Sequence, residues 1–184
     1  ATTKFYPHLI GLPENYSKRL FLQELCNKYG DFLVSTSFKN EAGDIVFWKH
    51  RSVLRCWECE KGFYFLDHAT HRSPLKCEVF LDVDTDVSEL NLHHICNYLK
   101  NHYSYQYRAY ASGGKGFHIH VFIPEMSIYD LSASRIGTFL RESLIIKFDC
   151  DLMKKSDKHL LALEGCPHWR TGQPKRLIKA WGGL

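Results

Sequence analysis

No stretch of this chain is apolar for long enough to cross a membrane. A membrane-spanning helix needs ~18 or more consecutive apolar residues, and polar or charged side chains interrupt every apolar run well before that length. The opening stretch, ATTKFYPHLIGLPENYSKRL, lacks the charged-then-apolar layout of a secretory signal peptide. The sequence therefore predicts a protein that neither inserts into a membrane nor is exported.

The chain also lacks internal repeats and low-complexity linkers, which argues against a solenoid or a string of domains. Its 184 residues, 45% of them hydrophobic and 14% aromatic, are enough for one well-packed domain. This composition argues against a disordered chain. No initiator Met is present. We therefore expect an excerpt of a longer protein.

The cysteines do not form a disulfide framework. There are seven, an odd number, and they are scattered along the chain. Together with the missing signal peptide, they predict reduced thiols and a cytoplasmic or nucleoid-associated location. The net charge of +4 is mild, but the positive charge gathers near the C-terminus. The basic residues there are Lys154, Lys155, Lys158, Arg170, Lys175, Arg176 and Lys179.

Hydrophobic periodicity predicts an α+β fold in two parts, 1–75 and 76–184. The first part reads as a helix that ends at Gly30, then two strands and a stretch that is either a hairpin or a small knob. The second part has the order β-α-β-β-α-β, the split βαβ layout of ferredoxin-like and RNA-recognition-motif-like folds. Its elements are predicted at 76–84, 87–103, 105–112, 116–124, 131–148 and, as the last short strand, 159–163.

Carboxylates alternate at the end of one predicted strand, CEVFLDVDTDVS, at Asp82, Asp84 and Asp86. Residues two apart share a face of a strand, so these charges repel one another unless cations neutralise them. Asp82 and Asp84 suit a hard divalent ion such as Mg²⁺ or Mn²⁺, which prefers oxygen ligands. The alternative is an ordinary acidic strand end, in which the negative charge of Asp86 interacts favourably with the dipole of the following helix.

A glycine-rich turn, SGGKGFH at 112–118, leaves backbone N–H groups open to approach by an anion. Ser112 and Lys115 add a hydrogen-bond donor and a positive charge. The turn leads into a strand with His118 and His120 on one face. It is not a Walker loop, because the spacing and the following helix are absent. The alternative is a hairpin turn with two surface histidines.

A third polar segment, 148–178, carries two more carboxylates, Asp149 and Asp151, and then His168 and Arg170. A carboxylate that converges on Asp82 and Asp84 would complete a site for two metal ions. Considered alone, this segment reads as a solvated basic loop.

In this order, the three segments resemble the three motifs of the archaeo-eukaryotic primase superfamily, over roughly 76–178. VFLDVD satisfies the family's hhhDhD/E motif, and SGGKGFH matches SGxxGxH. LEGCPHWRTG follows the pattern LPGxLHxxTG that comes after an hD pair in the third motif. One departure is Ala162, which stands where the family has a basic residue. Phosphate binding is then expected to rely on other cations, such as Lys115 or Arg170.

The resemblance implies an RNA-recognition-motif-like catalytic core beside an N-terminal α/β unit. It implies template-directed nucleotidyl transfer with two divalent ions, Mg²⁺ or Mn²⁺, and therefore a DNA template, a primer and nucleotides as partners. A helicase, a ligase or a large primase subunit would join in the full-length system. The implied metal ligands are Asp82, Asp84 and Asp149, with Asp151 as the rival for the third. The implied nucleotide-binding residues are Ser112, Lys115, Gly116, His118, His168 and Arg170.

Cys56 and Cys59, in CWEC, have the spacing of a zinc knuckle, and His68, His71 and Cys77 follow. They predict either a structural Zn²⁺ ion or a β-hairpin with unpaired thiols.

Two other function classes remain. HIH at 118–120 is also found in nicking endonucleases of rolling-circle replication, but none of the ten tyrosines has the Lys three positions on that such enzymes often use. A non-catalytic single-strand-binding module could stack bases on the aromatics of YSYQYRAY. Its carboxylates would repel a phosphate backbone unless metals intervene.

Overall fold

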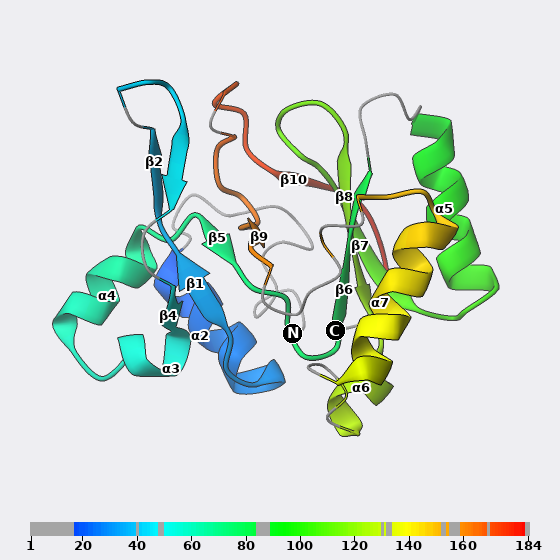
Figure 1. Ribbon diagram of the computed structural model, residues 1–184, viewed down its shortest axis with the longest axis horizontal. Coiled ribbons are helices and arrows are strands. Elements are labelled where there is room, and N and C mark those ends of the chain that lie inside the picture. The colour runs from blue at the N-terminus through cyan, green and yellow to red at the C-terminus, as the bar shows by residue number, and fades with distance from the viewer. Residues whose placement is uncertain are drawn as a thin grey trace.

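The computed structural model describes residues 17–39, 41–47, 50–83, 89–129, 131, 134–151, 154, 159–168 and 170–182. Asp84 and Asp86 lie outside these ranges. The described elements form two units side by side, each with its own antiparallel sheet and its helices on the outer side (Figure 1). The predicted α+β class is confirmed. No described helix has both the length and the apolar character needed to span a membrane.

The first unit begins with helix α2 (Lys18–Tyr29). The Ser17 hydroxyl accepts a hydrogen bond from the Leu20 N–H and caps its first turn. Gly30, with φ at +90°, ends the helix in a conformation that disfavours a side chain. One stripe of the helix is buried, at Phe21, Leu22, Leu25 and Cys26. The predicted helix over 15–29 and its end at Gly30 are thus confirmed in the described range.

The sheet of the first unit has the strand order β4-β1-β5-β9. Its strands are β4 (Arg51–Ser52), β1 (Leu33–Ser35), β5 (His71–Arg72) and β9 (Leu161–Ala162), beside a separate hairpin of β2 (Ser37–Lys39) and β3 (Ile45–Phe47). The last strand, predicted at 159–163, therefore joins this sheet and not the second one. The reason is that Leu163 and Cys166 pack into the hydrophobic core of the first unit.

The stretch predicted as a hairpin or a small knob forms two short helices, α3 (Val53–Cys56) and α4 (Glu60–Asp67), so the hairpin interpretation is wrong. Gly62 of α4 lies directly against the backbone of Cys56, where a Cβ would come within 2.0 Å of the carbonyl oxygen. The absence of a side chain at Gly62 therefore lets the two helices approach closely.

The second unit has the strand order β10-β7-β8-β6, with every neighbouring pair antiparallel. Its elements are β6 (Glu78–Val83), α5 (Glu89–Asn101), β7 (Gln106–Ala111), β8 (Phe117–Phe122), α6 (Pro124–Ile128), α7 (Arg135–Lys147) and β10 (Arg176–Trp181). Since β8 lies between β6 and β7, the first predicted split βαβ unit is present. The fourth strand is β10, on the far side of β7, whereas a second split unit would place it beside β6.

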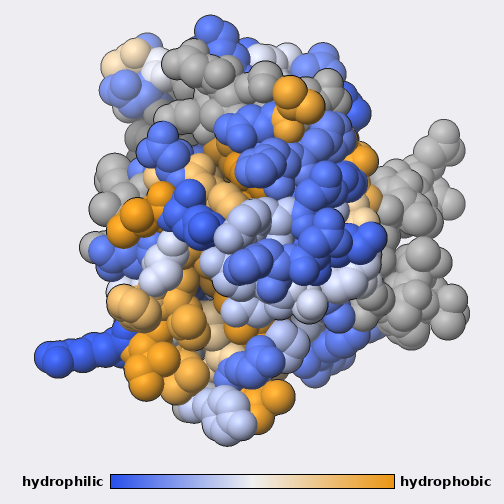
Figure 2. Space-filling view, turned by 90° about the vertical axis from the view of Figure 1, so that its right-hand side faces the viewer, coloured by the Kyte–Doolittle hydropathy of each residue, from blue (hydrophilic) through white to orange (hydrophobic). Residues whose placement is uncertain are grey.

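The two faces of this sheet differ in character because side chains alternate along each strand. Val79, Leu81 and Val83 of β6 point toward the helices and belong to the core that includes α5 and α7. Figure 2 views the outer side of this unit, where hydrophobic residues gather toward the lower left among hydrophilic ones. The opposite face of the sheet carries Glu78, Phe80, Asp82, Arg108, Tyr110, His118 and His120, and it meets the first unit.

Candidate active site

Asp82 and His118 lie opposite each other on neighbouring strands, near the end of β6 and the start of β8. The Asp82 Oδ1 atom is 3.7 Å from the His118 Nε2 atom, and the Asp82 side chain is 31% exposed. The structure therefore brings together two of the residues that the sequence nominates, at a sheet edge where a carboxylate can meet solvent or a cation.

His118 is held in its neutral form. Burial lowers its pKa well below the usual range, and the positive charge of Lys175 lowers it further. Its Nδ1 atom is buried and has no hydrogen-bond partner among the described residues. The contact between Asp82 and His118 therefore joins a carboxylate to a neutral imidazole and is not an ion pair.

The glycine-rich turn is shaped by Ser112. Its hydroxyl donates to the Lys115 carbonyl oxygen at 3.0 Å and accepts from the Gly114 N–H at 3.3 Å. Gly113 and Gly116 have φ angles of +88° and +90°, which side chains disfavour. Lys115 is exposed at the tip. In this conformation Ser112 organises the turn, and the charge available to an anion is that of Lys115.

The segment from Glu164 to Lys175 folds back on itself, and we call it the His168 hairpin. The Gly165 N–H donates to the Lys175 carbonyl oxygen, and the Lys175 N–H donates to that of Cys166. Toward the tip, the His168 N–H donates to the Gln173 carbonyl oxygen at 2.8 Å. This ladder of hydrogen bonds connects the tip of the hairpin to its base.

The tip of the His168 hairpin contacts the glycine-rich turn. The Thr171 hydroxyl donates to the Gly113 carbonyl oxygen across 58 residues of sequence. His168 Nδ1 accepts from the Arg170 N–H at 3.1 Å, so the proton of the neutral ring is on Nε2. A Cβ at Gly114 would lie 2.7 Å from that Nε2 atom. His168 thus presents an N–H donor to the same turn that offers backbone N–H groups.

Asp149 and Asp151 are the two candidates for the third carboxylate, and only the backbone of Asp151 is seen to bond to that of Asp82. Its N–H donates to the Asp82 carbonyl oxygen at 3.3 Å, and its side chain is half-buried. Asp149 is exposed and follows α7 in a left-handed conformation, with φ at +54°. Beside Asp151, the Lys154 amine is 2.9 Å from His159 Nε2. Sequence reasoning placed Lys154 only in a general basic tail.

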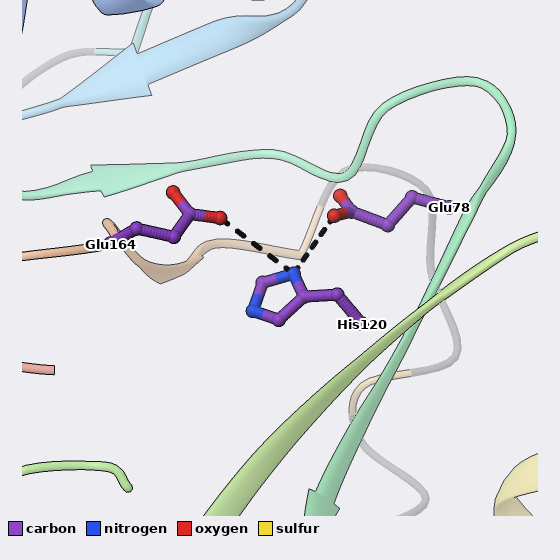
Figure 3. Close-up of side chains that lie close together, drawn as sticks. All are labelled: Glu78, His120 and Glu164. Carbon is purple, nitrogen blue, oxygen red and sulfur yellow. Dashed lines mark hydrogen bonds and ion pairs between the residues drawn. The ribbon is translucent and has the colours of Figure 1, made fainter. Parts of the chain in front are cut away.

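Another group lies deeper, between the two sheets, and was not predicted as a site. Ligand atoms of Glu78, His120 and Glu164 lie within 4.8 Å of one another, so that the group could hold a metal ion (Figure 3). His120 Nδ1 is 2.8 Å from Glu78 and 3.8 Å from Glu164. Arg72 already donates to both carboxylates, at 2.7 and 2.6 Å, and offsets one of their two negative charges. The single sequence signal was a glutamate inside the apolar run of β6.

His120 also bears on the nicking-endonuclease alternative, which needs two histidine ligands for one metal. Its Nδ1 contacts Glu78, and its Nε2 is 2.8 Å from the Lys175 amine. Both ring nitrogens are therefore engaged, and His118 has no second histidine ligand on this strand.

Cys56 is buried in the core of the first unit and Cys59 is exposed. Within the described ranges, neither belongs to a group of three or more residues that could hold a metal ion. The described part of the chain thus offers no third and fourth ligands for a zinc ion at CWEC.

Comparisons with known proteins add no assignment: no family model matches the chain, and no curated protein matches it.

Proposed function

We propose that this chain is the catalytic domain of a primase-polymerase of the archaeo-eukaryotic primase superfamily, acting in template-directed nucleotidyl transfer. One observation carries the proposal. The glycine-rich turn and the His168 hairpin, far apart in sequence, touch through Thr171 and Gly113 at the sheet edge where Asp82 lies. Three segments nominated for one chemistry therefore converge on one place, as a single site requires.

In this proposal, the metal ligands are Asp82, Asp84 and a third carboxylate. Asp151 is the better candidate than Asp149, because its backbone is hydrogen-bonded to Asp82 and its side chain is half-buried. Partly exposed carboxylates at a sheet edge fit hard divalent ions, which take oxygen ligands and keep several waters. When bound, two Mg²⁺ or Mn²⁺ ions supply Lewis-acid activation of a primer 3′-hydroxyl and neutralise the triphosphate charge.

The groups proposed to bind the triphosphate surround the glycine-rich turn. The Ser112 and Gly114 N–H groups donate within the turn, so the proposed phosphate donors are its other backbone N–H groups and the His168 Nε2–H. Such preorganised donors bind phosphate oxygens at little entropic cost. Lys115 and Arg170 are exposed and add positive charge. His118 is neutral, so it can donate one hydrogen bond without competing with the metal ions for the carboxylates. The DNA template and primer, and any helicase, ligase or large primase subunit, are partners that this function predicts.

The direct test is incorporation of labelled nucleotides on a primed DNA template, with Mg²⁺ or Mn²⁺ added. We expect activity that depends on the metal and falls by a factor of about 10² or more in Asp82→Asn, since a lost catalytic charge typically costs several kcal/mol. Asp67→Asn is the matched control, because Asp67 pairs with Arg19 on the surface of the first unit.

Full activity in Asp82→Asn would reject Asp82 as a metal ligand. Nicking of a labelled single strand, with a protein–DNA adduct and no incorporation, would reject the polymerase assignment as a whole.

A further inference from the structure

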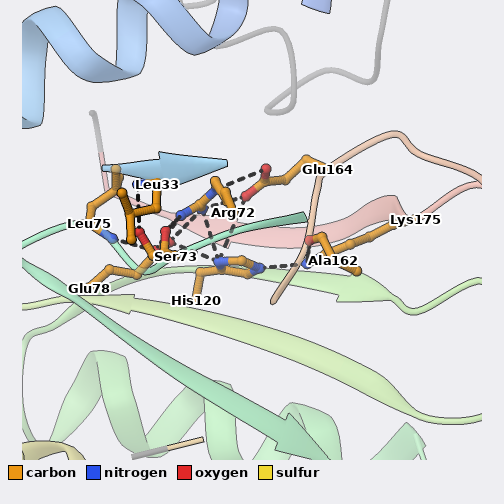
Figure 4. A network of polar contacts seen from close by, with 9 residues as sticks. All are labelled: Leu33, Arg72, Ser73, Leu75, Glu78, His120, Ala162, Glu164 and Lys175. Carbon is orange, nitrogen blue, oxygen red and sulfur yellow. Dashed lines mark hydrogen bonds and ion pairs between the residues drawn. The ribbon is translucent and has the colours of Figure 1, made fainter. Parts of the chain in front are cut away.

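A buried polar network joins the two units of the fold behind the candidate active site (Figure 4). It comprises Arg72 from β5, Glu78 from β6, His120 from β8, and Glu164 and Lys175 from the His168 hairpin. Each of these residues is at most 4% exposed. Isolated charges are not tolerated at such depth, so the network is stable only because its members satisfy one another.

Hydrogen bonds run through the network without a break. Arg72 donates to Glu78 through both of its terminal nitrogens, at 2.7 and 2.8 Å, and to Glu164 at 2.6 Å. His120 bridges Glu78 and the Lys175 amine, each at 2.8 Å. Lys175 donates further to the Ala162 carbonyl oxygen at 2.9 Å.

These contacts fix both the charge and the tautomer of the network. Glu78 can only accept, so the proton of His120 is on Nδ1, and its Nε2 accepts from Lys175. Burial and the positive charge of Lys175 lower the His120 pKa to about 4, in keeping with a neutral ring. Two cationic and two anionic side chains then balance each other around one neutral imidazole.

Glu164 and Lys175 stand at the two legs of the His168 hairpin, side by side at its base. Glu164 is tied to Arg72 of the first sheet, and Lys175 is tied to His120 of the second sheet as well as to the Ala162 carbonyl oxygen of the first. The ladder of the hairpin transmits this placement to its tip, where His168 faces Gly114.

We propose that Glu164 and Lys175 are positioning residues that set the distance between His168 and the glycine-rich turn, and thereby the affinity of that turn for a polyphosphate anion. Only the identity of this anion as a nucleotide triphosphate rests on the proposed function. The anion-binding geometry itself stands on the hydrogen bonds of the hairpin and the turn. A residue that merely stabilised the fold would change the melting temperature without changing the affinity of the folded protein.

The test compares the wild-type chain with the double variant Glu164→Gln/Lys175→Met. Removing one partner alone would strand a buried charge and endanger folding, whereas the double variant removes one charge of each sign. Binding of inorganic tripolyphosphate in the presence of Mg²⁺ is measured by titration calorimetry at a temperature where both proteins are folded. We expect binding weaker by about tenfold or more, as for other residues that act by orienting a binding group.

Glu164→Asp is the second variant, because it keeps the charge balance but shortens one anchor by a methylene group. We expect its affinity for tripolyphosphate to fall between those of the wild type and the double variant. Arg19→Met/Asp67→Asn is the control, since it also removes one ion pair but lies away from the hairpin. Unchanged affinity in both hairpin variants, or an equal loss in the control, would overturn the proposal.

A spectroscopic readout tests the same geometry without any ligand. Long-range ¹⁵N–¹H correlation spectra of the wild-type protein at pH 7 should show His120 as the Nδ1–H tautomer, with a change at Nε2 in the double variant. An Nε2–H tautomer in the wild type would exclude the bond from Lys175 and with it the proposal. If the protein incorporates no nucleotides yet binds tripolyphosphate as expected, the proposed function fails while this inference holds.

Discussion

At the scale of single residues, Gly114 and His168 illustrate how two remote segments constrain each other. The backbone of Gly114 has an ordinary conformation, so a side chain there is forbidden only by the nearby ring of His168. At Gly113, by contrast, a Cβ would meet the Gln173 carbonyl oxygen at 2.4 Å, in a left-handed conformation as well. Gly114 therefore leaves room for the His168 ring, and Gly113 allows both the left-handed turn and the close approach of the His168 hairpin.

Gly114→Ala should accordingly separate binding from stability. The new methyl group meets only the end of a side chain, which can rotate away, so we expect a change in unfolding free energy within about 1 kcal/mol. Under the proposed function, displacing His168 would remove a hydrogen bond to the nucleotide, which should raise the KM for nucleotides about tenfold.

Gly30→Ala is the control for Gly114→Ala, because Gly30 lies in the first unit, where its Cβ would come no nearer than 3.8 Å to the Lys76 side chain and only its φ of +90° is strained. It should cost about 1–3 kcal/mol of stability and leave the KM near that of the wild type. A Gly114→Ala enzyme with a wild-type KM would show that His168 does not contact the anion.

At the scale of elements, the long periodic segments were predictable and the short ones were not. Helices α2, α5 and α7 and strands β6, β7 and β8 follow from local patterns of apolar residues and caps. The two short helices α3 and α4 have too few turns to show a clear period. Strand β9 has only two residues, so its partner is decided by which core receives Leu163.

The approach of α3 to α4 gives a prediction at this scale. Gly62→Ala would place a methyl group 2.0 Å from a backbone oxygen of Cys56, which cannot move without shifting a helix. We expect a loss of about 3 kcal/mol in unfolding free energy, as for a severely overpacked core position, measured by urea denaturation.

Lys61→Ala is the neighbouring control for Gly62→Ala, since Lys61 is exposed on the same helix and should change stability by less than about 0.5 kcal/mol. Equal urea midpoints for the two variants would contradict the close helix contact.

At the scale of the whole molecule, the two units meet across polar groups that are held in fixed protonation states. Burial lowers the pKa of His71 to about 4, and the positive charges of Lys154 and Lys175 add to the effect. Burial and the charge of Lys175 likewise lower the pKa of His120 to about 4. Burial alone would raise the pKa of Glu164, but Arg72 outweighs it and lowers that pKa. At the interface between the units, the histidines are therefore neutral and the carboxylates are charged.

This predicts an acid-labile fold. In the unfolded chain both histidines take up protons near pH 6.5, whereas in the folded protein they do so only near pH 4. The unfolded state thus binds more protons between these values, and stability falls as the pH is lowered through that window. Each histidine contributes a slope of up to about 1.4 kcal/mol per pH unit.

Urea unfolding at pH 7.5, 6.5, 5.5 and 4.5 measures this slope, and His71→Gln should reduce it by about a third, because His118, whose pKa is also lowered, contributes together with His71 and His120. The lowered pKa of Glu164 acts only below its unfolded value near 4.5, so the loss between pH 6.5 and 5 reports on the histidines. A flat stability profile over that range would mean that His71 and His120 are charged or exposed in the folded protein.

The sequence by itself determined the α+β class, the long helices and strands, and the three segments that carry the candidate chemistry. Periodicity, glycine content and alternating carboxylates are local properties, and they can be read along the chain. Only the tertiary structure decided that Thr171 reaches Gly113, that β10 and not β9 completes the second sheet, and that Arg72, Glu78, His120, Glu164 and Lys175 form one network. A buried charge is tolerated because of partners brought from other segments, and no local pattern records where those partners will come from.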